Sequence, residues 1–112
     1  MMPDPRLLLL SAALLGAPLA AQTQHEGAGG GGAIDCGGDT ATITGASNRM
    51  TVTGRCKALV IEGAGNVVQV DLAPKGTIRI TGASNTVTWR TPDGSRPRLV
   101  VVGAGNRIAR AR

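Results

Sequence analysis

Apolar and polar residues alternate along most of the chain, in short stretches on both sides of a repeated four-residue turn. The turn is Gly45-Ala46-Ser47-Asn48, and Gly-Ala-Ser/Gly-Asn recurs at 63–66, 82–85 and 103–106. The Asn residues of successive copies are 18, 19 and 21 positions apart. Alternation with a period of two around a fixed turn is typical of half-buried β-strands. Each repeat therefore predicts a five-residue strand, the turn, and a second five-residue strand. The repeats are then joined by connections of increasing length at 54–57, 72–76 and 91–97.

The apolar positions coincide in every repeat when the copies are aligned on the Asn. Seven residues before the Asn, the repeats have Ala41, Leu59, Ile78 and Leu99. Five residues before it, they have Ile43, Ile61, Ile80 and Val101. Two residues after it, they have Met50, Val68, Val87 and Ile108. A fourth column holds Val52, Val70 and Trp89, but Arg110 in the last copy. Because terminal repeats need a polar end, we interpret Arg110 as a cap.

Two all-β architectures fit this pattern. In a β-solenoid each repeat is one coil, and coils stack about 4.8 Å apart through parallel ladders. In an antiparallel meander each repeat is a hairpin, and the Asn needs no reason beyond its preference for turns. We favour a short β-solenoid of about four coils, because a stack lets equivalent amides bond to one another. The predicted ladder consists of Asn48, Asn66, Asn85 and Asn106.

The two cysteines lie at matching places in consecutive repeats. Cys36 is 12 residues before Asn48, and Cys56 is 10 before Asn66. One coil of separation, about 4.8 Å, falls within the Cα distance that a disulfide spans. We therefore predict a Cys36–Cys56 disulfide that staples the first coil.

The N-terminal residues predict export. Residues 1–21 contain one Arg, a nine-residue apolar run at 7–15 and then small residues, which together resemble a secretory signal peptide. Residues 22–32 are rich in glycine and are expected to be a flexible linker, which leaves 33–112 as the repeat domain. We expect a periplasmic or secreted bacterial protein, in a compartment where disulfides persist, with no transmembrane segment after cleavage.

Composition excludes several kinds of chemistry. The chain has one His, two Cys, one Trp and neither Phe nor Tyr. One His rules out a multi-His metal site and a Ser-His-Asp triad, and a lone Trp gives no stacking platform for single-stranded nucleic acid. Gly103-Ala104-Gly105 imitates a dinucleotide fingerprint, but the chain ends before the helix that would hold a pyrophosphate. We expect no catalytic residue, metal or cofactor, and no sequence-specific nucleic-acid binding.

Charge is the feature that most suggests a partner. The formal net charge is +5, and arginines accumulate toward the C-terminus. Arginine suits bidentate contacts with phosphate, sulfate or carboxylate groups. An anionic envelope polymer is therefore one candidate partner, and self-association through an imperfectly capped solenoid end is another. The candidate polyanion contacts are Arg79, Arg90, Arg96, Arg98, Arg107, Arg110 and Arg112.

The motifs Ile34-Asp35-Cys36, Thr53-Gly54-Arg55-Cys56 and the run 82–89 resemble the bacterial family called domain of unknown function 3060. The resemblance covers about residues 33–110. It implies an exported bacterial protein to which no activity is assigned. We therefore expect a non-enzymatic structural or binding module of the envelope, with a polyanion-binding module as the alternative.

Overall fold

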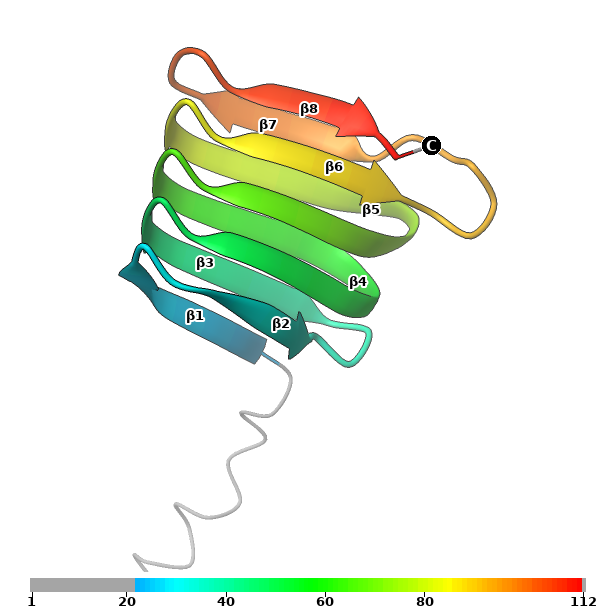
Figure 1. The fold of residues 1–112 in the computed structure, drawn as a ribbon. Helices are drawn as coiled ribbons and strands as arrows, with labels where there is room; N and C mark the ends of the chain where they lie inside the picture. Colours follow the sequence, from blue (N-terminus) through cyan, green and yellow to red (C-terminus); the bar gives the residue numbers. More distant parts are fainter. Residues whose placement is uncertain (1–21, 112) are drawn as a thin grey trace, which may run out of the picture.

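The computed structural model describes residues 22–111, which form a stack of coils made of parallel strands (Figure 1). The predicted signal peptide, 1–21, and Arg112 lie outside the described residues. The strands of the described part are β1 Gln22–Ala28, β2 Gly31–Asp35, β3 Thr40–Ala46, β4 Arg49–Ala64, β5 Val67–Ala83, β6 Thr86–Arg90, β7 Arg98–Val102 and β8 Arg107–Arg110. Every strand pairing is parallel, which confirms the solenoid and excludes the meander.

The pairings define five coils in the described chain. Coil 1 is 22–39, coil 2 is 40–57, coil 3 is 58–76, coil 4 is 77–97 and coil 5 is 98–111. Each coil has two sides. The first face of the solenoid is built from β1, β3, the second halves of β4 and β5, and β7. The second face is built from β2, the first halves of β4 and β5, β6 and β8.

The stack has one coil more than the four or so that the sequence predicts, because residues 22–32, expected to be a flexible linker, contain β1 and the start of β2. Residues 22–28 pair with 40–46 residue for residue, and 31–35 pair with 49–53, so this segment forms coil 1. Its turn is Gly27-Ala28-Gly29-Gly30, a further copy of the repeat in which Gly30 replaces the Asn. A parallel ladder is made by hydrogen bonds between backbone groups, and glycine has the same backbone groups as other residues. Glycine can therefore form the ladder, although it loses more conformational entropy on folding.

Two strands, β4 and β5, are much longer than the five residues that the alternation predicts, with 16 and 17 residues. β4 and β5 continue through the second corner of the coil, where connections at 54–57 and 72–76 were expected. Arg55 and Lys75 turn the chain there with positive φ angles of 53° and 61°. Of the three predicted connections, only the longest, 91–97, is a loop between strands, which we call the 91–97 loop.

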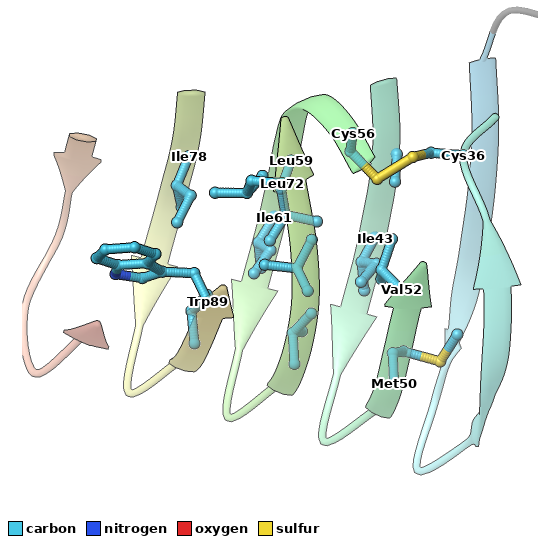
Figure 2. Close-up of a cluster of buried hydrophobic side chains, with 14 of the residues drawn as sticks. Cys36, Ile43, Met50, Val52, Cys56, Leu59, Ile61, Leu72, Ile78 and Trp89 are labelled. Carbon is cyan, nitrogen blue, oxygen red and sulfur yellow. A yellow bond between two sulfur atoms is a disulfide. The ribbon is translucent and has the colours of Figure 1, made fainter. Parts of the chain in front are cut away.

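The core is a set of aliphatic columns between the two faces (Figure 2). Ile43, Leu59, Ile61, Ile78 and Ile80 are fully buried, as the aligned columns predict. Trp89 lies at the C-terminal side of this core and is 7% exposed. Since coils repeat every few ångströms, branched aliphatic side chains fill the interior more evenly than rings would.

The asparagines form the predicted ladder along one corner. The Nδ2 atoms of Asn48, Asn66 and Asn85 each donate to Oδ1 of the next Asn at 3.0 Å. Each backbone N–H of the same residues donates to that Oδ1 as well, also at 3.0 Å. The Asn66 amide also donates to the carbonyl of Gly45 in the preceding coil at 3.0 Å. These bonds satisfy amides that would otherwise be buried at a cost.

The ladder corner also requires glycine. A Cβ on Gly63 would overlap the carbonyl oxygen of Gly45 in the preceding coil, and its φ is +142°. Gly45, Gly82 and Gly103 meet the same obstacle from the coil before each of them. The repeated glycine therefore reflects how closely the coils approach one another.

The predicted disulfide is present at the opposite corner. Cys36 and Cys56 are bonded, with their Cα atoms 5.8 Å apart, and the bond joins coil 1 to coil 2 (Figure 2). The described part of the chain contains no helix long and apolar enough to cross a membrane.

Candidate functional site

The single histidine belongs to the scaffold. His25 occupies the position in β1 that corresponds to the buried Ile43 in β3. Its Nε2 lies 3.3 Å from Oδ1 of Asn48, and the backbone N–H of Gly30 donates to the same oxygen at 3.1 Å. His25 and Gly30 therefore take the place of the missing Asn and end the ladder at coil 1.

The six candidate arginines within residues 22–111 are exposed, and the fold divides them among three places, while Arg112 lies outside the described residues. Arg79 and Arg98 lie on the first face, in neighbouring coils. Arg90 and Arg107 lie on the second face, at opposite ends of their strands. Arg96 and Arg110 line a common cleft at the C-terminal end of the solenoid. The fold therefore brings Arg79 near Arg98 and Arg96 near Arg110, keeps Arg90 and Arg107 apart, and does not form one surface from these arginines.

The C-terminal cleft has a volume of about 400 Å³. Besides Arg96 and Arg110, it is lined by Trp89, Leu99 and Ile108. Its lining thus combines apolar side chains of the last coil in the described chain with two cations. Such a cleft can hold an amphipathic anion, with the apolar part against Leu99 and Ile108.

Arg110 acts as the predicted cap over Trp89. Its guanidinium lies 5.1 Å from the centre of the indole ring, a cation–π distance. Its Nη2 donates to the carbonyl of Gly94 at 2.7 Å, which ties coil 5 to the 91–97 loop. The cap thus explains why an arginine stands in an otherwise apolar column.

The 91–97 loop is held by its own polar residues. The Thr91 hydroxyl donates to the Ser95 carbonyl at 2.9 Å, and the Ser95 N–H donates to Asp93 at 3.0 Å. Hydrogen bonds from the side chain and backbone of Ser95 lower the pKa of Asp93 below its usual value. The backbone N–H of Lys75 donates to the Ser95 hydroxyl at 3.1 Å, which anchors the loop on coil 3. The loop is therefore an ordered wall beside the cleft.

Charge separates along the axis of the solenoid. Coil 1 contains Glu26, Asp35 and Asp39 and no Lys or Arg, a formal charge of −3. Coil 5 contains Arg98, Arg107 and Arg110 and no acid, a formal charge of +3. One ion pair joins the N-terminal coils, between Lys57 and Asp39 at 3.4 Å. The described solenoid therefore has an acidic N-terminal end and a basic C-terminal end.

A second cleft, of about 380 Å³, lies on the second face. Its polar lining includes Thr51, Gln69 and Thr88, with Asp71 and Arg90 beside them. Asp71 and Arg90 are in register on adjacent strands. The carboxylate reduces the attraction of this cleft for an anion, so the C-terminal cleft is the stronger anion site.

The structure shows no gathering of residues for metal chemistry in its described part. Among residues 22–111, no three His, Cys, Asp or Glu side chains lie close enough to hold one ion. The buried polar side chains there are Asn48, Asn66, Asn85 and Thr91, and each makes hydrogen bonds within the scaffold.

Sequence reasoning missed the role of the 91–97 loop and of coil 1. The sequence shows a Pro92-Asp93-Gly94 turn in this connection, but it does not reveal the hydrogen bonds by which Thr91 and Ser95 hold the loop. Coil 1 was hidden because Thr23 and His25 occupy its apolar columns. The spacing of 18 residues from Gly27 to Gly45 was the available signal.

The comparisons with known proteins give a family and no named relative. The family described as "Protein of unknown function (DUF3060)" matches residues 43–106. No curated protein matches the chain significantly. No solved structure matches it significantly either.

Proposed function

The chain belongs to the DUF3060 family of proteins of unknown function, and from this premise we propose that it is an exported, non-enzymatic module of the bacterial envelope. Its role is structural or binding, and it acts through a rigid surface. The predicted signal peptide at 1–21 and the Cys36–Cys56 disulfide support export to an oxidising compartment.

One observation carries this proposal: the residue types that most often act in catalysis are engaged in structural bonds of the solenoid. Both cysteines form the disulfide, and His25 ends the Asn ladder. The buried asparagines bond to one another and to the backbone. A nucleophile or general base needs a reactive partner within hydrogen-bond reach, and these groups are engaged elsewhere.

Binding to isolated envelopes tests the proposed role. The oxidised protein is mixed with washed bacterial envelopes and sedimented, with a monomeric protein of similar size and charge as the control. We expect the chain to sediment with the envelopes while the control stays in solution. A chain that stays in solution at every salt concentration would refute an envelope role.

A second candidate, a polyanion-binding module, is favoured by the charge of the last two coils. Coils 4 and 5, residues 77–111, contain six arginines and one acid, Asp93. The C-terminal cleft adds apolar side chains beside two of these arginines. The ligand would be lipopolysaccharide, an acidic polysaccharide or extracellular DNA.

A salt titration on immobilised heparin distinguishes the two candidates. Binding through phosphate or sulfate groups weakens steeply with salt, and each lost contact lowers the slope. The double variant Arg96→Ala/Arg98→Ala removes basic groups near the C-terminal cleft, and Arg49→Ala/Arg55→Ala is the matched control on coil 2. Earlier elution of the first variant alone supports polyanion binding. No retention of the unmodified chain at low salt removes this candidate.

A further inference from the structure

The C-terminal end of the solenoid is an uncovered cross-section of the core. Leu99 and Val101 occupy the columns of Ile78 and Ile80 in the coil below. Ile78 and Ile80 are fully buried, whereas Leu99 is 49% exposed and Val101 is 40% exposed. The outer edges of β7 and β8 also lack a neighbouring strand in the described chain. Unpaired edges with exposed apolar side chains are sites where another strand adds.

The N-terminal end is also an open edge, but its character differs. Within residues 22–111, β1 pairs only with β3 and β2 pairs only with β4. Thr23 and His25 occupy the apolar columns there, and both are partly exposed. Glu26 and Asp35 are exposed on the same coil. This end therefore offers unpaired backbone groups, a polar interior and negative charge.

Gly27 at this end has no steric role within a single chain. At Gly45, Gly63, Gly82 and Gly103 an added Cβ would overlap a carbonyl oxygen of the preceding coil. Gly27 is the equivalent residue of coil 1, yet the nearest atoms to its added Cβ are 3.9 Å away. Its φ of +159° lies at the edge of the range that residues with a side chain rarely adopt, but no backbone atom of the described chain crowds this position. A coil stacked before coil 1 would place a carbonyl oxygen at this position and make the glycine necessary.

We propose that the chain stacks head to tail, with coil 5 of one copy against coil 1 of the next and Gly103 facing Gly27 across the junction. This inference deepens the proposed structural role by naming a second copy of the chain as its partner. The parallel register that runs through the five coils would continue across the junction, with β7 beside β1 and β8 beside β2.

Charge selects this orientation over the alternatives. Head-to-tail contact places the basic coil 5 against the acidic coil 1, with formal charges of +3 and −3. Joining two C-terminal ends would oppose +3 to +3, and joining two N-terminal ends would oppose −3 to −3. Like charges at an interface disfavour the wrong pairing.

The junction is expected to be weaker than the contact between coils of one chain. Leu99 and Val101 would face Thr23 and His25 instead of aliphatic side chains. The Asn ladder would stop at Asn106, because Gly30 holds the next ladder position. The contact is heterologous and does not close into a ring, so assembly produces oligomers of many lengths. The mean length of these oligomers increases with protein concentration.

A glycine substitution at the N-terminal end tests the stacking. The full coding sequence is expressed for export, and intact-mass measurement of the purified protein identifies the residue at which it begins. Sedimentation velocity is measured across a concentration series in low and high salt for wild type, Gly27→Ala and the control Gln24→Ala. Gln24 lies on the same strand and is exposed on the outer surface. Circular dichroism and thermal melting show whether each variant folds.

We expect wild type and Gln24→Ala to form a salt-sensitive series of oligomers at high concentration. Gly27→Ala should still fold, with at most a modest fall in melting temperature from its positive φ, but remain monomeric, because the new methyl group meets the Gly103 carbonyl of the other copy. A wild type that is monomeric at every concentration overturns the proposal, and so does assembly that stops at a dimer or survives in Gly27→Ala. The envelope role can fail separately, because this assay contains no envelope component.

Discussion

Asn66 accepts two hydrogen bonds from Asn48, one from its backbone N–H and one from its Nδ2, both at 3.0 Å. The same Asn66 side chain donates to Asn85 and to the carbonyl of Gly45. One fully buried side chain thus satisfies groups in the coils on both sides of it. The ladder is therefore a structural tie between coils as well as a turn preference.

Removing the middle of this ladder should be costly. Asn66→Ala leaves the two Asn48 donors and the Gly45 carbonyl without their partner inside the protein. We expect a loss of about 3 kcal/mol in the free energy of unfolding, since an unpaired buried polar group costs roughly 1–3 kcal/mol. Urea unfolding measures it.

Asn106→Ala is the matched control at the open end of the ladder. Asn106 is partly exposed, so water can replace the bonds that its side chain makes. We expect Asn106→Ala to lower the free energy of unfolding by less than half as much as Asn66→Ala. Equal costs at the two positions would show that the side chain acts through turn preference alone.

The ladder and the disulfide could be predicted from sequence because both follow from a regular repeat. Equivalent residues of a solenoid lie one coil apart, so the spacing of Asn48, Asn66, Asn85 and Asn106 already implies contact. Coil 1 could not be recognised in this way, because Thr23, His25 and Gly30 replace the residues that define the pattern. Its strands form by backbone pairing with coil 2, which composition does not reveal.

The candidate site was predictable in composition but not in arrangement. The excess of arginine toward the C-terminus is plain in the sequence, yet outward positions alternate between two faces of each coil. Arg79 and Arg90 therefore lie on opposite sides of the solenoid. The pairing of Arg96 with Arg110 depends on how the 91–97 loop folds back, which no periodicity describes.

Reduction of the disulfide should loosen the N-terminal coils first. Cys36 and Cys56 are 20 residues apart, and closing a loop of this length contributes about 3 kcal/mol. We expect a lower melting temperature with reductant and faster hydrogen exchange in β1 and β2 than in β5. Unchanged exchange in β1 and β2 after verified reduction would contradict this role.

A methyl group at Gly63 should prevent normal stacking of the coils. The Cβ of Gly63→Ala would overlap the Gly45 carbonyl in a backbone conformation that favours glycine. We expect a loss of more than about 4 kcal/mol, or failure to fold. Gly27→Ala is the matched control, because the same methyl group there overlaps no carbonyl of the described chain and its nearest neighbours are 3.9 Å away. Thermal melting of both variants would refute this steric explanation if their melting temperatures fell equally.

Tryptophan fluorescence reports whether Arg110 covers Trp89, because the chain has one Trp. Arg110→Ala removes the cation–π contact and the bond to Gly94. We expect emission shifted to longer wavelength as water reaches the indole, and a loss of about 1 kcal/mol in stability. Arg107→Ala, also in coil 5, should change neither. An unshifted spectrum in Arg110→Ala would show that the arginine does not cover the ring.

Intact-mass measurement on fractionated cells tests the proposed exported module most directly. The whole chain is expressed in a bacterium, and the protein is recovered from the cytoplasm, the periplasm and the medium. We expect a species in the periplasm or medium that begins at Gln22 and is lighter than its reduced form by the two hydrogens of the Cys36–Cys56 disulfide. A cytoplasmic species that begins at Met1 and carries two free thiols would contradict the proposed role.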